Sequence, residues 1–361
     1  MKKSRGLLIA FLAMVLAASL GVLSACGGSA SQSSTSKEKL DVSKENVEPV
    51  QLKTEPFYVM VIGNDSREGT VEINQEAYKD GKGRSDTLML VRLDPKTYQI
   101  TLLTVPRDTA NTYNGETRKI NEMLKFEGVE GLEKAVADLT GIKVDHYLMC
   151  RFGTFEQLID DFGGIALDVK ADQSMQDIVS GDKIEYPAGK YDSLNGKETL
   201  VFARERHAYD PDGEVYRQSN DRHIVQSLIE QILAKPQTAV EVATKLLGDI
   251  ETDWDQRELL AYVEDFMKNA DKVKFVSGTG PWEGGEDPDT GLWVTTRDED
   301  TWAEVTKVVN AGGDPNDVVT TLSLYASDDQ ATEESAKSDE AAPADDAGAA
   351  AEGEGEGEGA E

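Results

Sequence analysis

The chain has 361 residues, of which 39% are hydrophobic, and its formal net charge at pH 7 is −31. A chain of this length can form one large domain or two small ones. Its negative charge argues against nucleic acid as a partner, because a phosphate backbone is bound by a basic surface. Any cluster of arginines in so acidic a chain is therefore informative.

The first 25 residues have the pattern of a secretory signal. A basic start precedes an apolar run from Gly6 to Leu23, and Ser and Ala come directly before Cys26. The segment resembles a bacterial lipobox, so we expect a signal peptide over residues 1–25 and a lipid on Cys26. The run is also just long enough to span a bilayer, which makes a single N-terminal transmembrane helix the alternative. Both interpretations place the rest of the chain outside the cytoplasm, tethered to the membrane.

Two further segments lack the pattern of a folded domain. Residues 26–55 are rich in Ser, Lys and Glu without apolar periodicity, which predicts a flexible spacer. Residues 326–361 contain thirteen acidic residues and one lysine and end in a Gly-Glu repeat, which predicts a disordered acidic tail. No linker interrupts residues 56–325, so we expect one domain there.

The domain begins with three apolar segments that we expect to be strands, Phe57–Ile62, Leu88–Leu93 and Ile100–Val105. Later strands are expected over Val144–Phe152, Ile165–Val169, Val273–Ser277 and Leu292–Thr295. Helices are expected over 131–139, 155–162, 197–206, 217–234, 238–247, 255–269 and 298–310. The alternation of strands and helices predicts an α/β fold with a central sheet.

Each of the first three strands has an arginine and an aspartate near one end. The pairs are Asp65 with Arg67, Arg84 with Asp86, and Arg107 with Asp108. Ligands of open α/β sheets bind at strand ends. Carboxylates there suit a divalent cation, and guanidinium groups suit phosphate.

More arginines follow at Arg204, Arg206 and Arg217. A single surface arginine is usually solvated or paired with a nearby acid. Several arginines that converge repel one another unless an anion lies between them, and pyrophosphate is such an anion. Asp65 and Asp86 could hold a cation that bridges the phosphate oxygens, or they could be ordinary salt-bridge or turn-capping acids.

Eight segments together resemble the LytR-CpsA-Psr domain, in the order in which that family carries them. They are Val61–Arg67, Gly83–Leu88, Val105–Asp108, Lys119–Asn121, Leu158–Gly164, Tyr186–Gly189, Leu194–Gly196 and Ala203–Arg206. The resemblance covers about 57–233. It implies a sandwich-like αβα fold with a central mixed sheet flanked by helices.

The resemblance also implies a function, which is transfer of a glycopolymer phosphate from a polyprenyl-pyrophosphate carrier to a peptidoglycan hydroxyl. By this resemblance Asp65 and Asp86 would bind Mg²⁺ or Mn²⁺, and Asp210 would orient or deprotonate the acceptor hydroxyl. The implied pyrophosphate contacts are Arg67, Arg84, Arg107, Arg204, Arg206, Arg217 and Arg222.

One position departs from the family pattern. Many relatives have Arg-Gln or Asn-Gln three residues after the position of Arg217, where this chain has Asn220 and Asp221. A charge thus replaces the usual amide, and Arg222 is the candidate to replace the missing phosphate contact. Two alternatives to a transferase stay open, namely a hydrolase that uses water as the acceptor and a non-catalytic lipoprotein that binds polyprenyl phosphate or glycan.

Overall fold

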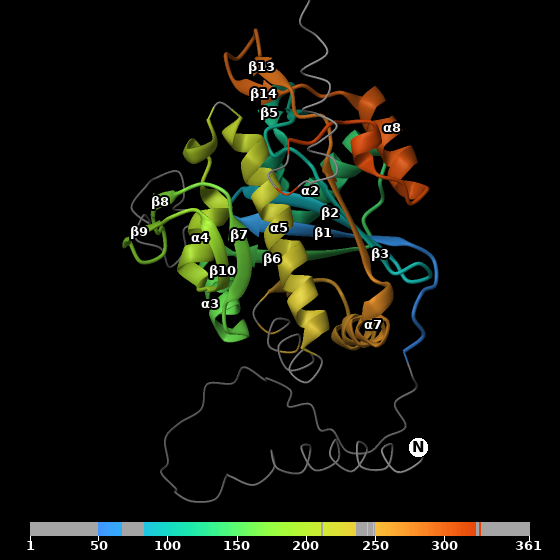
Figure 1. The fold of residues 1–361 in the computed structure, drawn as a ribbon. Helices are drawn as coiled ribbons and strands as arrows, with labels where there is room; N and C mark the ends of the chain where they lie inside the picture. The colour runs from blue at the N-terminus through green and yellow to red at the C-terminus, as the bar shows by residue number, and fades with distance from the viewer. Residues whose placement is uncertain are drawn as a thin grey trace, which may run out of the picture. The chain divides into compact units, whose positions relative to one another are not determined.

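The computed structural model describes residues 50–66, 83–210, 212–235, 244, 248, 250–322 and 325 (Figure 1). The predicted signal peptide, the spacer up to residue 49 and the acidic tail lie outside the described residues, as do Cys26 and Arg67. The helix expected over 238–247 lies outside them as well, except at Thr244.

A six-stranded sheet forms the centre of the domain (Figure 1). Its strand order is β11 (Glu251–Thr252), β6 (His146–Arg151), β1 (Phe57–Asn64), β2 (Ser85–Asp94), β3 (Gln99–Thr104), β12 (Lys274–Thr279). β1 pairs parallel to β6 and β3 pairs parallel to β12, whereas the other three pairs are antiparallel. The sheet is therefore mixed, and the carboxyl ends of β1, β3, β6 and β12 meet the amino end of β2 at one edge.

Both faces of the sheet are covered, because apolar side chains point alternately to the two sides of each strand. On one face Met60, Ile62 and Leu90 pack against α2 (Met123–Thr140) and α8 (Glu299–Asn310). On the other face Val59 and Val91 pack against α5 (Gly213–Ala234) and α7 (Gln256–Lys268). The three layers confirm the expected αβα fold.

A smaller group of elements lies beside α5 (Figure 1). It contains α3 (Phe152–Phe162), β7 (Ile165–Val169), β8 (Gln173–Gln176), β9 (Lys183–Tyr186), β10 (Gly189–Leu194) and α4 (Gly196–Arg204). Its own core contains Ile159, Leu167 and Phe202, and Ile224 of α5 joins that core. Asn195 caps α4 with a capping box, since its side chain accepts from Glu198 N while the Glu198 carboxylate accepts from Asn195 N.

Two hairpins lie near the amino end of α5 (Figure 1). One consists of β4 (Ala110–Tyr113) and β5 (Glu116–Lys119), and the other of β13 (Gly284–Glu286) and β14 (Trp293–Thr295). An isolated parallel bridge between Thr109 and Thr295 joins them. Short 3₁₀ helices are η2 (Ile120–Glu122), η3 (His207–Tyr209), η4 (Ala270–Lys272) and η5 (Pro315–Asp317).

The structure corrects several boundaries. β8, β13 and the β4–β5 hairpin lie where no strand was expected, because their short polar sequences lack apolar alternation. α5 begins at Gly213 instead of residue 217. Its first turn contains Glu214, whose carboxylate pairs with Arg217 three residues on and so supports helix there.

Candidate functional site

The candidate site lies at the sheet edge where β1 and β3 end and β2 begins. A β-bulge shapes this edge, since Gly63 pairs with Thr87 but Asn64 pairs with Ser85, which leaves Asp86 as the extra residue. Bulges re-aim side chains and are common next to active sites. The Asp86 Oδ1 atom lies 2.8 Å from Nη1 of Arg107, at the end of β3.

Asp65 is held against the start of β2. Its backbone N–H donates to the Arg84 carbonyl at 3.0 Å, and its Oδ1 accepts from the Arg84 backbone N–H at 2.5 Å. A Cβ at Gly83 would lie 1.8 Å from Oδ1 of Asn64, so only glycine allows this close approach. The side chain of Asp65 is thereby fixed at the site edge, where it is buried.

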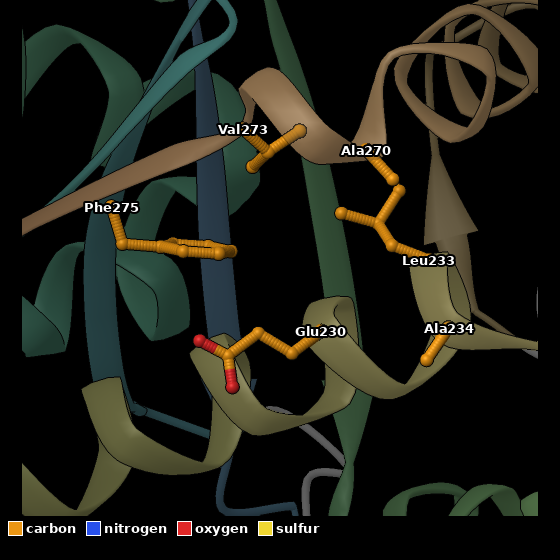
Figure 2. Close-up of a pocket in the computed structure, with 6 residues that line it drawn as sticks. All are labelled: Glu230, Leu233, Ala234, Ala270, Val273 and Phe275. Atoms are coloured by element: carbon orange, nitrogen blue, oxygen red, sulfur yellow. The ribbon is translucent and has the colours of Figure 1, made fainter.

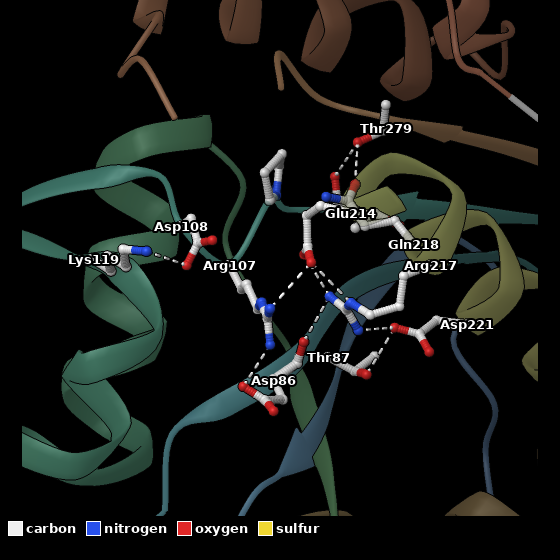
Figure 3. Close-up of polar contacts among 12 residues, drawn as sticks. Asp86, Thr87, Arg107, Asp108, Lys119, Glu214, Arg217, Gln218, Asp221 and Thr279 are labelled. Atoms are coloured by element: carbon white, nitrogen blue, oxygen red, sulfur yellow. Dashed lines mark hydrogen bonds and ion pairs between the residues drawn. The ribbon is translucent and has the colours of Figure 1, made fainter. Parts of the chain in front are cut away.

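Arg107 and Arg217 converge on Glu214, whose carboxylate lies between the two guanidinium groups (Figure 3). Glu214 Oε2 accepts from Arg107 Nη2 at 3.1 Å and from Arg217 Nε at 3.1 Å, and Glu214 Oε1 accepts from Arg217 Nη2 at 2.7 Å. Burial alone would raise the pKa of Glu214, but Arg217, Arg107 and Arg206 lower it to about 2. A carboxylate of the protein therefore compensates these converging arginines.

Asp221 completes the coordination of Arg217. Its Oδ2 accepts from Arg217 Nη1 at 2.9 Å and from the Thr87 hydroxyl at 2.9 Å, while Arg217 Nη2 also donates to the Asp86 carbonyl at 3.1 Å. Burial raises the pKa of Asp221 to about 6, and Arg217 acts in the opposite direction. The acid that replaces the family's amide is thus a partner of Arg217, and Arg217 is a buried organiser of the network.

Arg222 and Asn220 point away from this network. Arg222 donates to Ser277 Oγ at 3.1 Å and to Thr104 Oγ1 at 2.8 Å, between α5 and the β3–β12 pair, and burial lowers its pKa to about 10. Asn220 accepts from the Tyr325 hydroxyl at 2.9 Å. The structure therefore places Arg222 beneath the site edge rather than facing it.

The remaining predicted site residues have contacts outside this network. Arg84 pairs with Glu122 at 3.0 Å, and Arg204 donates to the Gln176 carbonyl at 3.4 Å and lies over the Phe152 ring. Arg206 is exposed and close enough to help lower the pKa of Glu214. Asp210 has 69% of its side chain exposed and lies 3.8 Å from Nδ1 of His207.

Glu214 and Thr87 are members of the network that the sequence did not identify as candidates. Thr87 lies within Gly83–Leu88, one of the segments that carry the family resemblance. Glu214 carried one detectable signal, an acid three residues before Arg217 in a segment with helix-forming residues. Its second partner, Arg107, is 107 residues away in the chain, and only the fold reveals that contact.

The donor set fits a magnesium ion that takes most of its ligands from elsewhere. Asp65 directly follows β1, and Asp86 lies in the neighbouring strand β2. Among the described residues no group of three His, Cys, Asp or Glu side chains could hold a metal. Mg²⁺ commonly uses one or two carboxylates and completes its shell with water and substrate phosphates. Asp86 would share its carboxylate between such a cation and Arg107.

An apolar pocket of about 290 Å³ lies between the carboxyl end of α5, η4 and the start of β12 (Figure 2). It is lined by Glu230, Leu233, Ala234, Ala270, Val273 and Phe275. Phe275 lies near the start of β12, whereas Thr279 ends that strand at the site edge and donates to Gln218. The helix α5, about 33 Å long, thus has the arginine network at its amino end and the pocket at its carboxyl end. Within the part of the chain that the structure describes, no helix is long and apolar enough to cross a membrane.

Fold and site together define an α/β protein with an arginine-rich site at the edge of a mixed sheet. The model of the LytR_cpsA_psr family matches residues 24–310, and the chain belongs to this family. Its fold is similar to those of solved structures. One is Bacillus subtilis TagV, with a TM-score of 0.58 at 25% identity over 72% of this chain and 98% of the other. Another is TagT bound to LI-WTA, with a TM-score of 0.56 at 20% identity over 74% and 95%, which shows the fold alone.

Two relatives of known name come from Bacillus subtilis (strain 168). The polyisoprenyl-teichoic acid–peptidoglycan teichoic acid transferase TagV is 30% identical over 241 residues, which are 64% of this chain and 59% of TagV. The transferase of the same description named TagU is 30% identical over 197 residues, 54% of this chain and 58% of TagU. The matched part thus spans less than two thirds of either relative.

Proposed function

We propose that this protein is an extracytoplasmic, membrane-anchored phosphotransferase that attaches a glycopolymer to peptidoglycan from a polyprenyl-pyrophosphate carrier. The observation that carries the proposal is the placement of Arg107 beside Asp86 at the sheet edge where Asp65 is held by the Arg84 backbone. Family membership supports it, as do relatives named as transferases of polyisoprenyl-linked teichoic acid to peptidoglycan.

The arginines bind the pyrophosphate of the donor. Arg107 keeps a planar, permanently charged group at the edge, and Arg84 and Arg206 present guanidinium groups that are at least partly exposed. Arg204 donates to the Gln176 carbonyl at 3.4 Å, and we propose that it too contacts the donor. Glu214 and Asp221 hold Arg217 in place, and Arg217 in turn holds the carbonyl of Asp86.

The acceptor hydroxyl attacks the sugar-side phosphorus of the pyrophosphate. A new P–O bond forms to the peptidoglycan sugar, and the bond to the bridging oxygen breaks, so that polyprenyl phosphate leaves. Asp210, on the exposed loop before α5, orients the hydroxyl and accepts its proton. Positioning and stabilisation of the negative charge that shifts to the leaving group supply most of the rate.

Asp65 and Asp86 are the residues that would hold Mg²⁺, or Mn²⁺ in its place. A bound divalent cation would neutralise phosphate charge there. The apolar pocket by Leu233 and Phe275 supports a lipid-linked donor, because an isoprenoid chain has no polar groups and binds apolar surface.

The test is a reconstituted reaction of the purified protein with a polyprenyl-pyrophosphate glycan, Mg²⁺ and peptidoglycan. Mass spectrometry should find the glycan linked to peptidoglycan through a phosphodiester, together with free polyprenyl phosphate. Release of glycan phosphate to water, with or without peptidoglycan, would instead identify a hydrolase. Donor that binds tightly and is recovered intact would identify a non-catalytic binding protein.

A further inference from the structure

Trp293, at the start of β14, is an exposed aromatic residue beside the arginine network. It is 45% exposed, and among the described residues only Val50 is another large hydrophobic residue classed as exposed. Trp254 and Trp302, by contrast, are buried in the two cores that cover the sheet. An indole offers a large flat face for contact, so its place in the fold decides what it can bind.

The backbone of β14 ties Trp293 to the site. Two residues on, Thr295 donates its N–H to the Asp108 carbonyl at 2.9 Å and pairs with Thr109. Asp108 directly follows Arg107, the central arginine of the site. The indole therefore stands on a strand that is joined to the loop carrying Arg107.

Lys119 connects the indole to the same loop. Its Nζ lies 6.0 Å from the centre of the Trp293 ring and 3.0 Å from Oδ1 of Asp108. Figure 3 shows this lysine pointing at Asp108 beside Arg107. The Lys119 ammonium is held both by the face of the Trp293 ring and by the Asp108 carboxylate. These two contacts restrict its position, so a hydrogen-bond donor is fixed near the indole.

An acceptor group lies on the neighbouring strand of the same hairpin. Glu286 on β13 is paired directly with Trp293 across the hairpin, and residues so paired project to the same face. Glu286 is exposed. The surface thus presents a flat apolar ring with an ammonium donor over it and a carboxylate acceptor paired with it across the hairpin.

This combination matches a sugar ring. The C–H face of a pyranose is apolar and packs on an aromatic face, while its hydroxyls donate to carboxylates and accept from ammonium groups. An alkyl chain would leave Lys119 and Glu286 without any function in binding. We propose that Trp293, Lys119 and Glu286 form a sugar-binding subsite that holds a pyranose ring of the glycan next to the phosphate bound by Arg107.

This inference rests on the proposed function, because two sugars meet at such a reaction centre. One belongs to the donor and is linked to the pyrophosphate, and the other belongs to the peptidoglycan acceptor. The subsite chemistry is common to both, so binding experiments have to separate them.

The test uses the full chain and measures binding by isothermal titration calorimetry, independently of turnover. The probes are an N-acetylglucosamine tetramer for the acceptor, and a short-chain prenyl pyrophosphate with and without a disaccharide for the donor. Trp293→Leu should weaken binding of at least one sugar-bearing probe about tenfold, while Trp293→Phe keeps most of the affinity. The sugar-free prenyl pyrophosphate should bind the wild type and both variants equally.

The pattern of losses identifies the source of the sugar, and the controls isolate the subsite. Weaker binding of the disaccharide-bearing donor alone assigns the subsite to the donor, and weaker binding of the tetramer alone assigns it to the acceptor. Val50→Ala, at the other exposed apolar residue, should change the affinity for neither sugar-bearing probe. Equal affinity of Trp293→Leu and wild type for both sugar probes overturns the subsite. Loss of sugar-free pyrophosphate binding in Trp293→Leu overturns it too, whereas absence of transfer with normal sugar binding refutes only the proposed function.

Discussion

Asp86 is the extra residue of a β-bulge at the start of β2, and its carboxylate lies 2.8 Å from the Arg107 guanidinium at the end of β3. The bulge aligns the side chain with the next strand, so that two residues from separate motifs become partners. This pair is the point where the proposed cation and the proposed phosphate meet.

Asp86→Asn tests the proposed role of this carboxylate. The change keeps the size of the side chain and removes its charge, so transfer activity should fall about a hundredfold or more, by comparison with other losses of transition-state charge stabilisation. Circular dichroism should show the fold intact. Asp65→Asn should behave in the same way, and Asp192→Asn, on the exposed face of β10, should retain full activity. Transfer at the wild-type rate in both site variants would show that the metal assignment is wrong.

The lowered pKa of Glu214 predicts that the protein loses stability in acid. Its pKa is lowered to about 2 from an ordinary value of 4.5, so its contribution is complete above about pH 4.5 and is lost as the pH falls towards 2. The shift corresponds to about 3 kcal/mol. The free energy of unfolding, measured in urea, should therefore fall less for Glu214→Gln than for wild type between pH 4.5 and 2.5.

At pH 7 the same variant should be less stable than wild type by about 3 kcal/mol, because the buried Arg217 and the partly buried Arg107 lose a shared partner. Glu304→Gln, on the exposed side of α8, is the matched control. It should change neither the free energy of unfolding at pH 7 nor its decrease in acid. Identical acid sensitivity of Glu214→Gln and wild type would show that this carboxylate does not compensate the arginines.

Glu156 predicts the opposite pH dependence. This buried acid hydrogen-bonds to Asp177, and burial together with that acid raises its pKa to about 8. Between about pH 4.5 and 8 the native state keeps a proton that the unfolded chain has released, so stability falls as the pH rises. Glu156→Gln keeps a donor without titrating, and its melting temperature should exceed that of wild type increasingly from pH 5 to 9. A constant difference over that range would contradict the assignment.

Tyr325 predicts where the folded domain ends. Its ring stacks on His223 with centroids 4.0 Å apart, and its hydroxyl donates to Asn220. Truncation after residue 325 should leave the free energy of unfolding nearly unchanged, since the tail composition cannot form a core. Tyr325→Ala should cost about 2 kcal/mol by removing a half-buried aromatic ring. A loss of several kcal/mol on truncation alone would mean that the tail packs on the domain.

Cys26 predicts how the protein is anchored. The signal pattern leads us to expect cleavage before Cys26 and a diacylglycerol on its sulfur. Intact-mass measurement of the membrane-bound protein should show a lipid-bearing chain that begins at Cys26, and Cys26→Ala should be released or left unprocessed. Wild-type protein that keeps Met1 in the membrane would favour a transmembrane helix instead.

The sequence alone was sufficient to predict the layers of the fold and to identify the family. Strands such as Phe57–Ile62 carry apolar residues on both faces, which requires a covering layer on each side, and the motif order identified the family that the comparisons confirm. The acids and arginines near strand ends could be recognised for the same reason, since strand ends are local features of the chain.

Only the tertiary structure decided which of these side chains meet. Glu214 comes between Arg107 and Arg217 because the first turn of α5 crosses the end of β3, a contact between segments 107 residues apart. Arg222 faces Thr104 because it lies on the side of α5 that faces the sheet. The sequence around Arg222 does not reveal this orientation. The strand that carries Trp293 is joined to the loop after Arg107 because Thr295 bonds to Asp108 across 187 residues of chain. Local pattern depends on neighbours in sequence, whereas the chemistry of a site depends on neighbours in space, and long-range packing alone determines those.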